Sequence, residues 1–177
     1  VGTGKLRKKN TIKEKNDPRV QFMDSLKKKL PNINFNFFGM NGIQPIWASN
    51  FDKNIRDCYM GICLQRKPLL KYGLSDRVVQ YLGNGLMVFI ENETQYYDIL
   101  KRDKEAVYFD GVEDLTEKIE FYKQNKDEAL KIAYNGHKRM HHDFNEKVIT
   151  NYMLDCLDYK DSSSLLDKYN WPIHFYS

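Results

Sequence analysis

The sequence predicts an α/β protein with a Rossmann-like, doubly wound and mostly parallel sheet, and two observations lead to this prediction. Short apolar runs, such as residues 59–64 and 86–90, alternate with segments whose apolar residues recur at helical spacing. Strands that alternate with helices along a chain are typical of parallel sheets covered by helices. The 177 residues, 41% of them hydrophobic and 14% aromatic, are enough for one domain with a sizeable core.

The first elements are marked by the residues at their ends. Asp17 is a favoured N-cap residue and Pro18 suits the first helical position, so we expect a helix to begin here. Pro31 ends that helix. Residues 33–37 alternate apolar and asparagine side chains, and this alternation predicts a strand.

The remaining elements follow from the same two periodicities. Asp110 and Glu113 also have the spacing of a capping box. The expected order is short helix, strand, helix, strand, helix, strand and three helices, over residues 50–58, 59–64, 75–85, 86–90, 92–101, 106–109, 110–124, 126–144 and 145–159. The side chains expected to face inward are Val78, Val79 and Leu82; Leu115, Ile119 and Tyr122; Leu130, Ala133, His137 and Met140; and Val148, Ile149, Tyr152, Met153 and Cys156.

Composition argues against several classes of protein. No run approaches the roughly 18 to 20 apolar residues of a membrane-spanning helix. Three cysteines, Cys58, Cys63 and Cys156, form no even-numbered framework and indicate buried free thiols in a reducing compartment. The spacing of Cys58 and Cys63 is not that of a zinc site, and His137 and His141 lack a third ligand, so we expect no metal.

The positive charge is concentrated at one end of the chain. Residues 1–30 carry ten Lys and Arg against three acidic residues, a net charge of +7, so residues 31–177 carry −3 of the total of +4. This asymmetry favours an anionic partner near the N-terminus, which would be a phosphate, an anionic lipid or a nucleic acid. A solvated run of lysines is the alternative on charge alone.

Residues 1–10, VGTGKLRKKN, look at first like the end of a phosphate-binding P-loop. That motif needs a hydroxyl residue after its lysine, where this chain has Leu6, and nothing before Val1 supplies its first glycine. The alternatives are a flexible lysine-rich terminus and a glycine turn that serves another phosphate. The abrupt start at Val1 leads us to expect a domain of a longer protein.

Ligands of open parallel sheets bind where the carboxyl ends of the strands meet the N-termini of helices. This rule selects residues 2–9, 65–77 and 91–95. The second segment is the most informative, because a helix start capped by Ser75 or Asp76 offers backbone N–H groups to an anion. The basic residues around that start are Arg66, Lys67, Lys71 and Arg77. In the alternative interpretation, Ser75 only caps a helix and these side chains are solvated.

Three segments carry a resemblance to a known family: KYGLSDRVVQYLGNGLMVFIENETQYYDIL, DGVEDLTEKIEFY and DEALKIAYNGHKRMHHDFNEKVITNYML. Together they resemble the C-terminal half of a GT-B glycosyltransferase, and within that group the family-1-like transferases that include spore-maturation-type proteins. The shared pattern is Ser-Asp-Arg at a helix start, a glycine turn, a buried strand and two later helices. The resemblance covers roughly residues 33–158.

The resemblance implies that residues 1–158 form the lobe that binds a nucleotide-sugar donor, while a separate N-terminal lobe binds a glycan, lipid or protein acceptor. The implied reaction is sugar transfer from a nucleoside diphosphate, without a cofactor or a tightly bound metal, and with the catalytic base in the absent lobe. Nucleic acid is not among the implied partners. Residues 159–177 are expected to form a tail whose Trp171 and Pro172 dock on the other lobe.

On this resemblance the donor diphosphate meets the helix that starts at Ser75, and the glycine turn near Val1 faces it from the other side. Many retaining members carry two glutamates where this chain has Tyr72 and Gln80, so the stereochemistry does not transfer, although Gln80 can still bond a ribose hydroxyl. Tyr72 or Tyr81 is a candidate to stack on the base, with core packing as the alternative for Tyr81. The expected donor-binding residues are Gly2, Gly4, Lys5, Arg7, Arg66, Lys71, Tyr72, Ser75, Asp76, Arg77 and Gln80.

A second class of function stays open on the sequence. In a non-enzymatic module, the basic N-terminal segment would bind an anionic membrane or nucleic acid, with strong salt dependence. Lipid attraction and sugar transfer are also compatible, because a basic patch can hold a transferase at an anionic membrane. We expect a cytoplasmic protein, and this compatibility allows peripheral contact with the inner face of a membrane.

Overall fold

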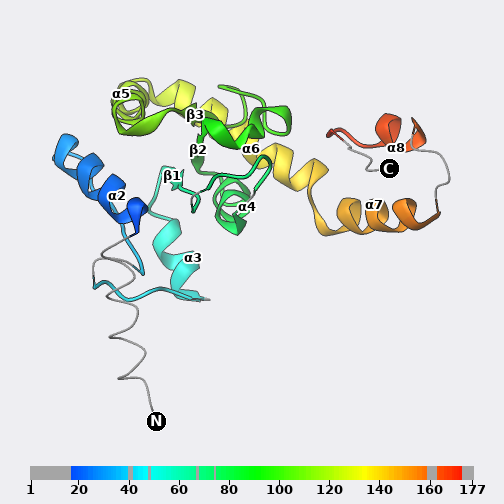
Figure 1. Cartoon of the computed structure of the whole chain (residues 1–177), viewed down its shortest axis with the longest axis horizontal. Helices are drawn as coiled ribbons and strands as arrows, with labels where there is room; N and C mark the ends of the chain where they lie inside the picture. Colours follow the sequence, from blue (N-terminus) through cyan, green and yellow to red (C-terminus); the bar gives the residue numbers. More distant parts are fainter. Residues whose placement is uncertain are drawn as a thin grey trace, which may run out of the picture.

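A computed structural model of the chain describes residues 17–39, 42–47, 49–66, 68–73, 75–158 and 163–172. Its centre is a three-stranded parallel sheet in the order β1-β2-β3 (Figure 1). The strands are β1 (Met60–Cys63), β2 (Met87–Glu91) and β3 (Val107–Phe109). Each was predicted from a short apolar run, and the predicted α/β fold is confirmed.

The helices surround this sheet and continue past it. Asp17 caps the first one as predicted, because its carboxylate accepts a hydrogen bond from the backbone N–H of Arg19 at 3.0 Å. The helices are α2 (Pro18–Lys29), α3 (Ser49–Ile55), α4 (Asp76–Gly83), α5 (Gly111–Gln124), α6 (Lys126–Asp143), α7 (Glu146–Asp158) and α8 (Ser163–Lys168).

The two faces of the sheet are covered by different helices, because successive strand residues point to opposite sides. Phe89 lies on one face in a cluster with Leu26 of α2 and Leu115 of α5. Tyr108 lies on the other face in a cluster with Leu82 of α4 and with α6. Burial on both sides explains why β2 and β3 are continuous apolar runs rather than alternating ones.

Two glycines allow close approach between elements. A Cβ on Gly136 of α6 would lie 2.4 Å from the backbone oxygen of Glu105 and 2.6 Å from Leu82 Cδ2, so any side chain there would push α6 off the sheet. A Cβ on Gly61 of β1 would lie 2.4 Å from the ring of Tyr81. The Tyr81 ring therefore packs over β1, which was one of the two roles considered for it.

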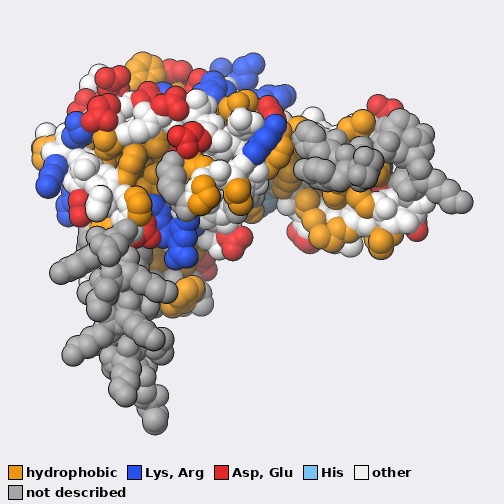
Figure 2. Space-filling model, in the orientation of Figure 1, with side chains coloured by type: hydrophobic (Ala, Val, Ile, Leu, Met, Phe, Trp, Pro, Cys, Tyr) orange, Lys and Arg blue, Asp and Glu red, His pale blue; other side chains and the backbone are white. Residues whose placement is uncertain are grey.

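A C-terminal arm, defined as α7, α8 and Trp171, extends past the end of α6 and away from the sheet (Figure 1). None of the residues of α7 is buried. Figure 2 shows apolar side chains along this helix, among which Leu157 is 82% exposed. The Trp171 ring stacks on Phe144 at 5.2 Å between centroids and lies 4.9 Å from Tyr169. Docking of Trp171 on another lobe stays a prediction.

Arg139 joins this arm to the sheet. Its side chain is only 6% exposed, and its guanidinium contacts the carboxylate of Asp143. It also donates hydrogen bonds to the backbone oxygens of Ile99, at 3.3 Å, and of Asn170. Glu105 lies 3.9 Å away as a second counter-ion. One buried cation therefore links α6, the segment after β2 and the chain beyond α8.

The strand predicted at residues 33–37 is not formed. An extended segment belongs to a sheet only when its backbone pairs with a neighbour, and no described strand pairs with this one. The alternation has another cause. The apolar side chains of Ile33, Phe35 and Phe37 pack against the core cluster to which α2 and α5 contribute. The Phe35 and Phe37 rings are stacked, with centroids 5.7 Å apart.

The helix predicted at residues 92–101 is also wrong in type. Two short 3₁₀ helices, η1 (Asn92–Thr94) and η2 (Tyr96–Asp98), occupy most of this segment. Gln95 between them has a φ of 55°, and a left-handed residue interrupts a right-handed helix. The connection after β2 is therefore a tight turn, here called the 92–98 turn.

Some side chains that were expected to face inward are exposed, and the capping box expected for Asp110 and Glu113 is not formed. Val79 is 41% exposed and Leu130 is 60% exposed, although both were expected inward. In α7 all the expected inward residues are at best half-buried, and its Cys156 is exposed rather than buried. At the start of α5, the backbone N–H of Asp110 donates to Asp114 Oδ2 at 2.8 Å, and Glu113 pairs instead with Lys29 at 3.2 Å.

Among the described residues, we find no helix of the length and apolarity that crossing a lipid bilayer would require.

Candidate functional site

The three parallel strands end at one edge of the sheet, here called the carboxyl edge. Gln65 and Arg66 follow β1, Glu91 ends β2, and Asp110 follows β3. Glu91 and Phe109 are paired in register, so the ends of β2 and β3 lie side by side. Polar and charged residues from three connections therefore meet where parallel sheets hold their ligands.

The N-terminus of α4 is fixed to the end of β1 by Arg77. Ser75 is the N-cap, and its hydroxyl accepts hydrogen bonds from the backbone N–H of Arg77 at 3.4 Å and from Arg77 Nε at 3.0 Å. The same guanidinium donates to the backbone oxygen of Leu64 at 3.0 Å. The helix start therefore lies beside the carboxyl end of β1, as the sequence predicted. The N-terminus of a helix is the positive end of its dipole and favours anions.

Glu91 holds the connection after β1 in place. Its carboxylate accepts a hydrogen bond of 2.7 Å from the backbone N–H of Gln65. Arg66, which the sequence assigned to an anion, is the next residue along this connection. Arg66 is exposed, and no hydrogen bond or ion pair joins it to another described residue.

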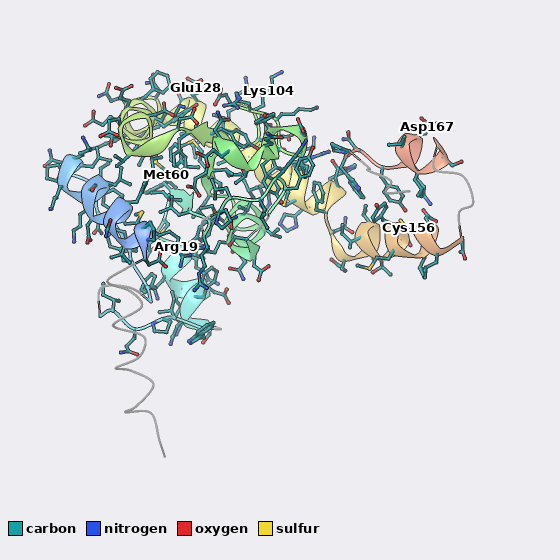
Figure 3. All side chains as sticks on the ribbon, in the orientation of Figure 1. Arg19, Met60, Lys104, Glu128, Cys156 and Asp167 are labelled. Carbon is teal, nitrogen blue, oxygen red and sulfur yellow. The ribbon has the colours of Figure 1, made fainter. Side chains whose placement is uncertain are left out.

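A third arginine, Arg19, reaches this edge from α2. Arg19 forms a forked pair with Asp17, with Nε 3.0 Å from Oδ1 and a terminal nitrogen 2.6 Å from Oδ2. The hydrogen bonds from Arg19 lower the pKa of Asp17 to about 2, and the charge of Arg66 contributes to that shift. Glu91 in turn raises the pKa of Arg19, although less than Asp17 does. Figure 3 labels Arg19 at the start of α2.

Beyond β2 and β3, side chains link the next two connections. The Asn92 amide donates to Asp110 Oδ2 at 3.1 Å and accepts a hydrogen bond from Arg102. The Arg102 guanidinium carbon lies 5.0 Å from the ring centroids of both Tyr97 and Tyr108. Aromatic faces attract a guanidinium, so this cation is held at the carboxyl edge by both rings.

The structure brings together some of the predicted donor-binding residues and leaves others apart. Ser75 and Arg77 are in direct contact, and Lys71 Nζ lies 4.8 Å from the Tyr72 ring centroid. Tyr72 in turn contacts the 92–98 turn, where its hydroxyl donates to Asp98 Oδ2 at 2.6 Å. Asp76 and Gln80 are exposed on α4, and no hydrogen bond or ion pair of the described residues joins the Gln80 side chain to the others. Gly2, Gly4, Lys5 and Arg7 lie outside the described residues.

The donor-binding residues expected from the sequence did not include Arg19, Asp17, Glu91 or Asn92. Glu91 and Asn92 stood in the third selected segment, directly after an apolar strand, and that position was the available signal. The signal for Arg19 was weaker. It lies two residues after Asp17, the N-cap of α2, and helix N-termini are where ligands of parallel sheets bind. Its pairing with Asp17 is local, but its nearness to Glu91 depends on the fold.

Two other features do not add to the site. A hollow of about 480 Å³ lies at the end of α2, and it is lined by Asp24, Lys27, Lys28, Leu30, Pro31 and Ile33, none of them a predicted donor-binding residue. Within the described part of the chain, no group of three or more His, Cys, Asp or Glu could hold a metal ion. The His137 and His141 rings lie 4.3 Å apart, and His141 Nε2 is 3.0 Å from the backbone oxygen of Gly83.

Comparison with known proteins shows to which family this chain belongs. A family described as glycosyl transferase-like matches residues 16–155, which is most of the chain. The chain belongs to the glycosyl transferase-like family. Its matched region includes the sheet, α4 with its N-cap Ser75, and the 92–98 turn. The resemblance expected from the sequence is confirmed.

A solved structure shares the fold of this glycosyl transferase-like chain. It is the C-terminal domain of a glycosyl transferase group 1 family protein (LpcC) from Francisella tularensis, with a TM-score of 0.50 and 15% sequence identity. The similarity covers 72% of this chain and 64% of that domain. At this identity the similarity concerns the fold, which is that of a C-terminal GT-B lobe. No curated protein matches the chain.

Proposed function

We propose that this chain is the donor-binding lobe of a glycosyltransferase, which transfers a sugar from a nucleoside diphosphate to a glycan, lipid or protein acceptor. The observation that carries the proposal is the start of α4. In a chain of the glycosyl transferase-like family, Ser75 and Arg77 place a helix N-terminus directly at the carboxyl end of β1. That location suits a diphosphate, because backbone N–H groups and the helix dipole favour negative charge there.

The proposed chemistry is electrostatic. As the bond to the sugar breaks, negative charge grows on the leaving nucleoside diphosphate, and fixed dipoles and cations that already face it lower the barrier. In this proposal, Arg66 and Lys71 supply positive charge to the diphosphate, whereas Arg77 positions the helix start. Asp76 lies in the first turn of α4, and Gln80 bonds a ribose hydroxyl.

The proposal assigns the other half of the reaction to groups that are not among the described residues. Among these groups we propose Gly2, Gly4, Lys5 and Arg7 as further donor-binding residues. An acceptor-binding lobe supplies the catalytic base, and no cofactor or tightly bound metal takes part. The lobe alone then binds nucleotide but transfers sugar poorly.

Isothermal titration against UDP-, GDP-, ADP- and CMP-sugars tests this proposal. We expect at least one nucleoside diphosphate sugar to bind, and binding to none of them would refute the donor role. The double variant Arg66→Gln with Lys71→Gln should weaken binding by at least about tenfold, because one hydrogen bond to a charged group contributes a net of about 1.5–3 kcal/mol and about 1.4 kcal/mol is a factor of ten.

The matched control is Arg56→Gln. Arg56 is also exposed, but it precedes β1 and therefore lies at the opposite end of that strand from Arg66. We expect this variant to bind as the wild type does. Equal weakening by both changes would mean that the nucleotide responds to overall charge, and it would remove the assignment to the carboxyl edge.

A further inference from the structure

Tyr72 has a backbone conformation that its residue type does not favour. Its φ is 57°, in the left-handed region that non-glycine residues seldom adopt, and a tyrosine there is uncommon. It is the third residue of a turn that is closed by a 3.0 Å hydrogen bond from the backbone N–H of Gly73 to the backbone oxygen of Leu70. Gly73 itself does not have a positive φ. The chain therefore places the strained conformation on Tyr72, next to a glycine that could adopt it freely.

Three hydrogen bonds hold Tyr72 to the 92–98 turn. Its backbone N–H donates to the backbone oxygen of Thr94 at 3.0 Å, and its own backbone oxygen accepts from the Tyr96 hydroxyl at 2.8 Å. Its hydroxyl donates to Asp98 at 2.6 Å. These partners lie on alternate residues of one turn, so Tyr72 is attached along its length. Strained residues persist only where the surroundings determine them this strongly.

The other end of this attachment is firmly built. Thr94 is fully buried, and its hydroxyl donates to the backbone oxygen of Glu91 at 2.7 Å. Tyr96 is 4% exposed, and its ring meets the Tyr72 ring edge-on at 6.4 Å. The 92–98 turn therefore moves with the end of β2, while Tyr72 lies three residues before the N-cap of α4.

We propose that Tyr72 is a positioning residue that locks the start of α4 to the 92–98 turn and thereby sets the affinity for the nucleoside diphosphate. The inference rests on the proposed donor function. It gives the Tyr72 side chain a role that differs from stacking on the base, because its hydroxyl is bonded to Asp98. With the lock in place, Ser75, Arg77 and Glu91 keep fixed distances, so a ligand does not have to order them on binding.

The test compares Tyr72→Phe, Asp98→Ala and Tyr72→Gly with the wild type. Titration uses UDP, GDP and ADP, and hydrogen exchange is followed in peptides that cover residues 75–82. We expect each variant to bind the preferred nucleotide about three to ten times more weakly and to exchange faster at the start of α4. Tyr72→Phe combined with Asp98→Ala should be no worse than either alone, since both remove the same bond. Asp98→Asn, which keeps an acceptor for the hydroxyl, should stay within about twofold of the wild type.

Tyr97→Phe is the matched control, because Tyr97 lies on the same turn but its ring contacts Tyr108 and Arg102 instead. It should leave affinity and exchange unchanged. A merely structural role for Tyr72 would lower the melting temperature and leave the dissociation constant unchanged at a temperature where all variants are folded, and that result would overturn the inference.

Tyr72→Gly distinguishes the effect of the backbone conformation on binding from the effect of the side chain. Glycine adopts a positive φ without strain, so wild-type binding in this variant would show that the turn alone positions α4, and the inference would fail. Failure of the wild type to bind any of the three nucleotides would refute the donor role instead. In that case, unchanged exchange in Tyr72→Phe would refute the lock as well, and faster exchange would support it.

Discussion

The sheet body and the C-terminal arm contain helices of similar sequence pattern, yet α6 of the body and α7 of the arm differ sharply in burial. Helix α6 buries five residues, because it lies on β2 and α4, whereas its neighbour α7 buries none. Both helices have apolar stripes in the sequence. The difference shows that an amphipathic pattern predicts an apolar helix face that favours burial. It does not predict which element of the fold covers that face.

The difference extends to how each region is held. In the body, apolar side chains such as Phe89 are fully buried between layers. In the arm, aromatic contacts among Trp171, Tyr152 and Tyr169 do most of the joining, together with the contact of Asn170 to Arg139. We therefore expect the body to set the free energy of global unfolding and the arm to open at lower cost.

The largest effect is expected for Phe89→Ala set against Leu157→Ala. Phe89 has no exposed surface, so its truncation leaves a cavity at the centre of the sheet and should lower the free energy of unfolding by about 3–5 kcal/mol. Leu157 is 82% exposed, and its truncation should change that free energy by less than about 0.5 kcal/mol. Urea unfolding followed by circular dichroism measures both, and similar losses would contradict the contrast between the two regions.

A smaller but still large effect is expected for Arg139→Met, which acts on both regions. The change leaves Glu105 and Asp143, which are 13% and 15% exposed, without their shared cation, and should cost about 3 kcal/mol. It should also free the segment around Asn170, so limited proteolysis should cut the arm faster than in the wild type. Lys138→Met changes an exposed cation of the same helix and should do neither. Destabilisation without faster cutting of the arm would show that Arg139 serves the body alone.

The parts that were predictable from the sequence are those with local causes. Ser75 was one of two candidate caps, with Asp76, because a short polar side chain before a helical pattern satisfies a nearby backbone N–H, and the observed contact of Ser75 spans only two residues. The three strands were found because burial on both faces leaves a continuous apolar run. The expected inward position of Val79 failed, since one turn of pattern on α4 does not determine which way its edge residues face.

The parts that were missed depend on distant contacts. Glu91 reaches Gln65 across 26 residues, and Tyr72 reaches Asp98 across the same separation, so neither pair has a signal in a single sequence. The strand expected at residues 33–37 failed for a related reason, because alternation predicts a buried face but not a pairing partner. The carboxyl edge could therefore be located from the sequence, whereas the network that positions its residues could not.

The smallest global effect is expected for Trp171→Ala, which tests whether the arm is separate from the body. Trp171 stacks on Phe144 and contacts Tyr152 and Tyr169, so its loss should loosen α7 and α8 while the sheet stays folded. Hydrogen exchange should quicken in peptides from residues 146–158, and urea unfolding of the body should shift by less than about 1 kcal/mol. Tyr134→Ala removes an exposed aromatic side chain from α6 and serves as the control, with no change expected in either measurement. If Trp171→Ala instead destabilised the sheet as much as Phe89→Ala does, the arm and the body would form one cooperative unit. Loss of a contact in the arm can lower the free energy of unfolding of the sheet to that extent only if both regions unfold together.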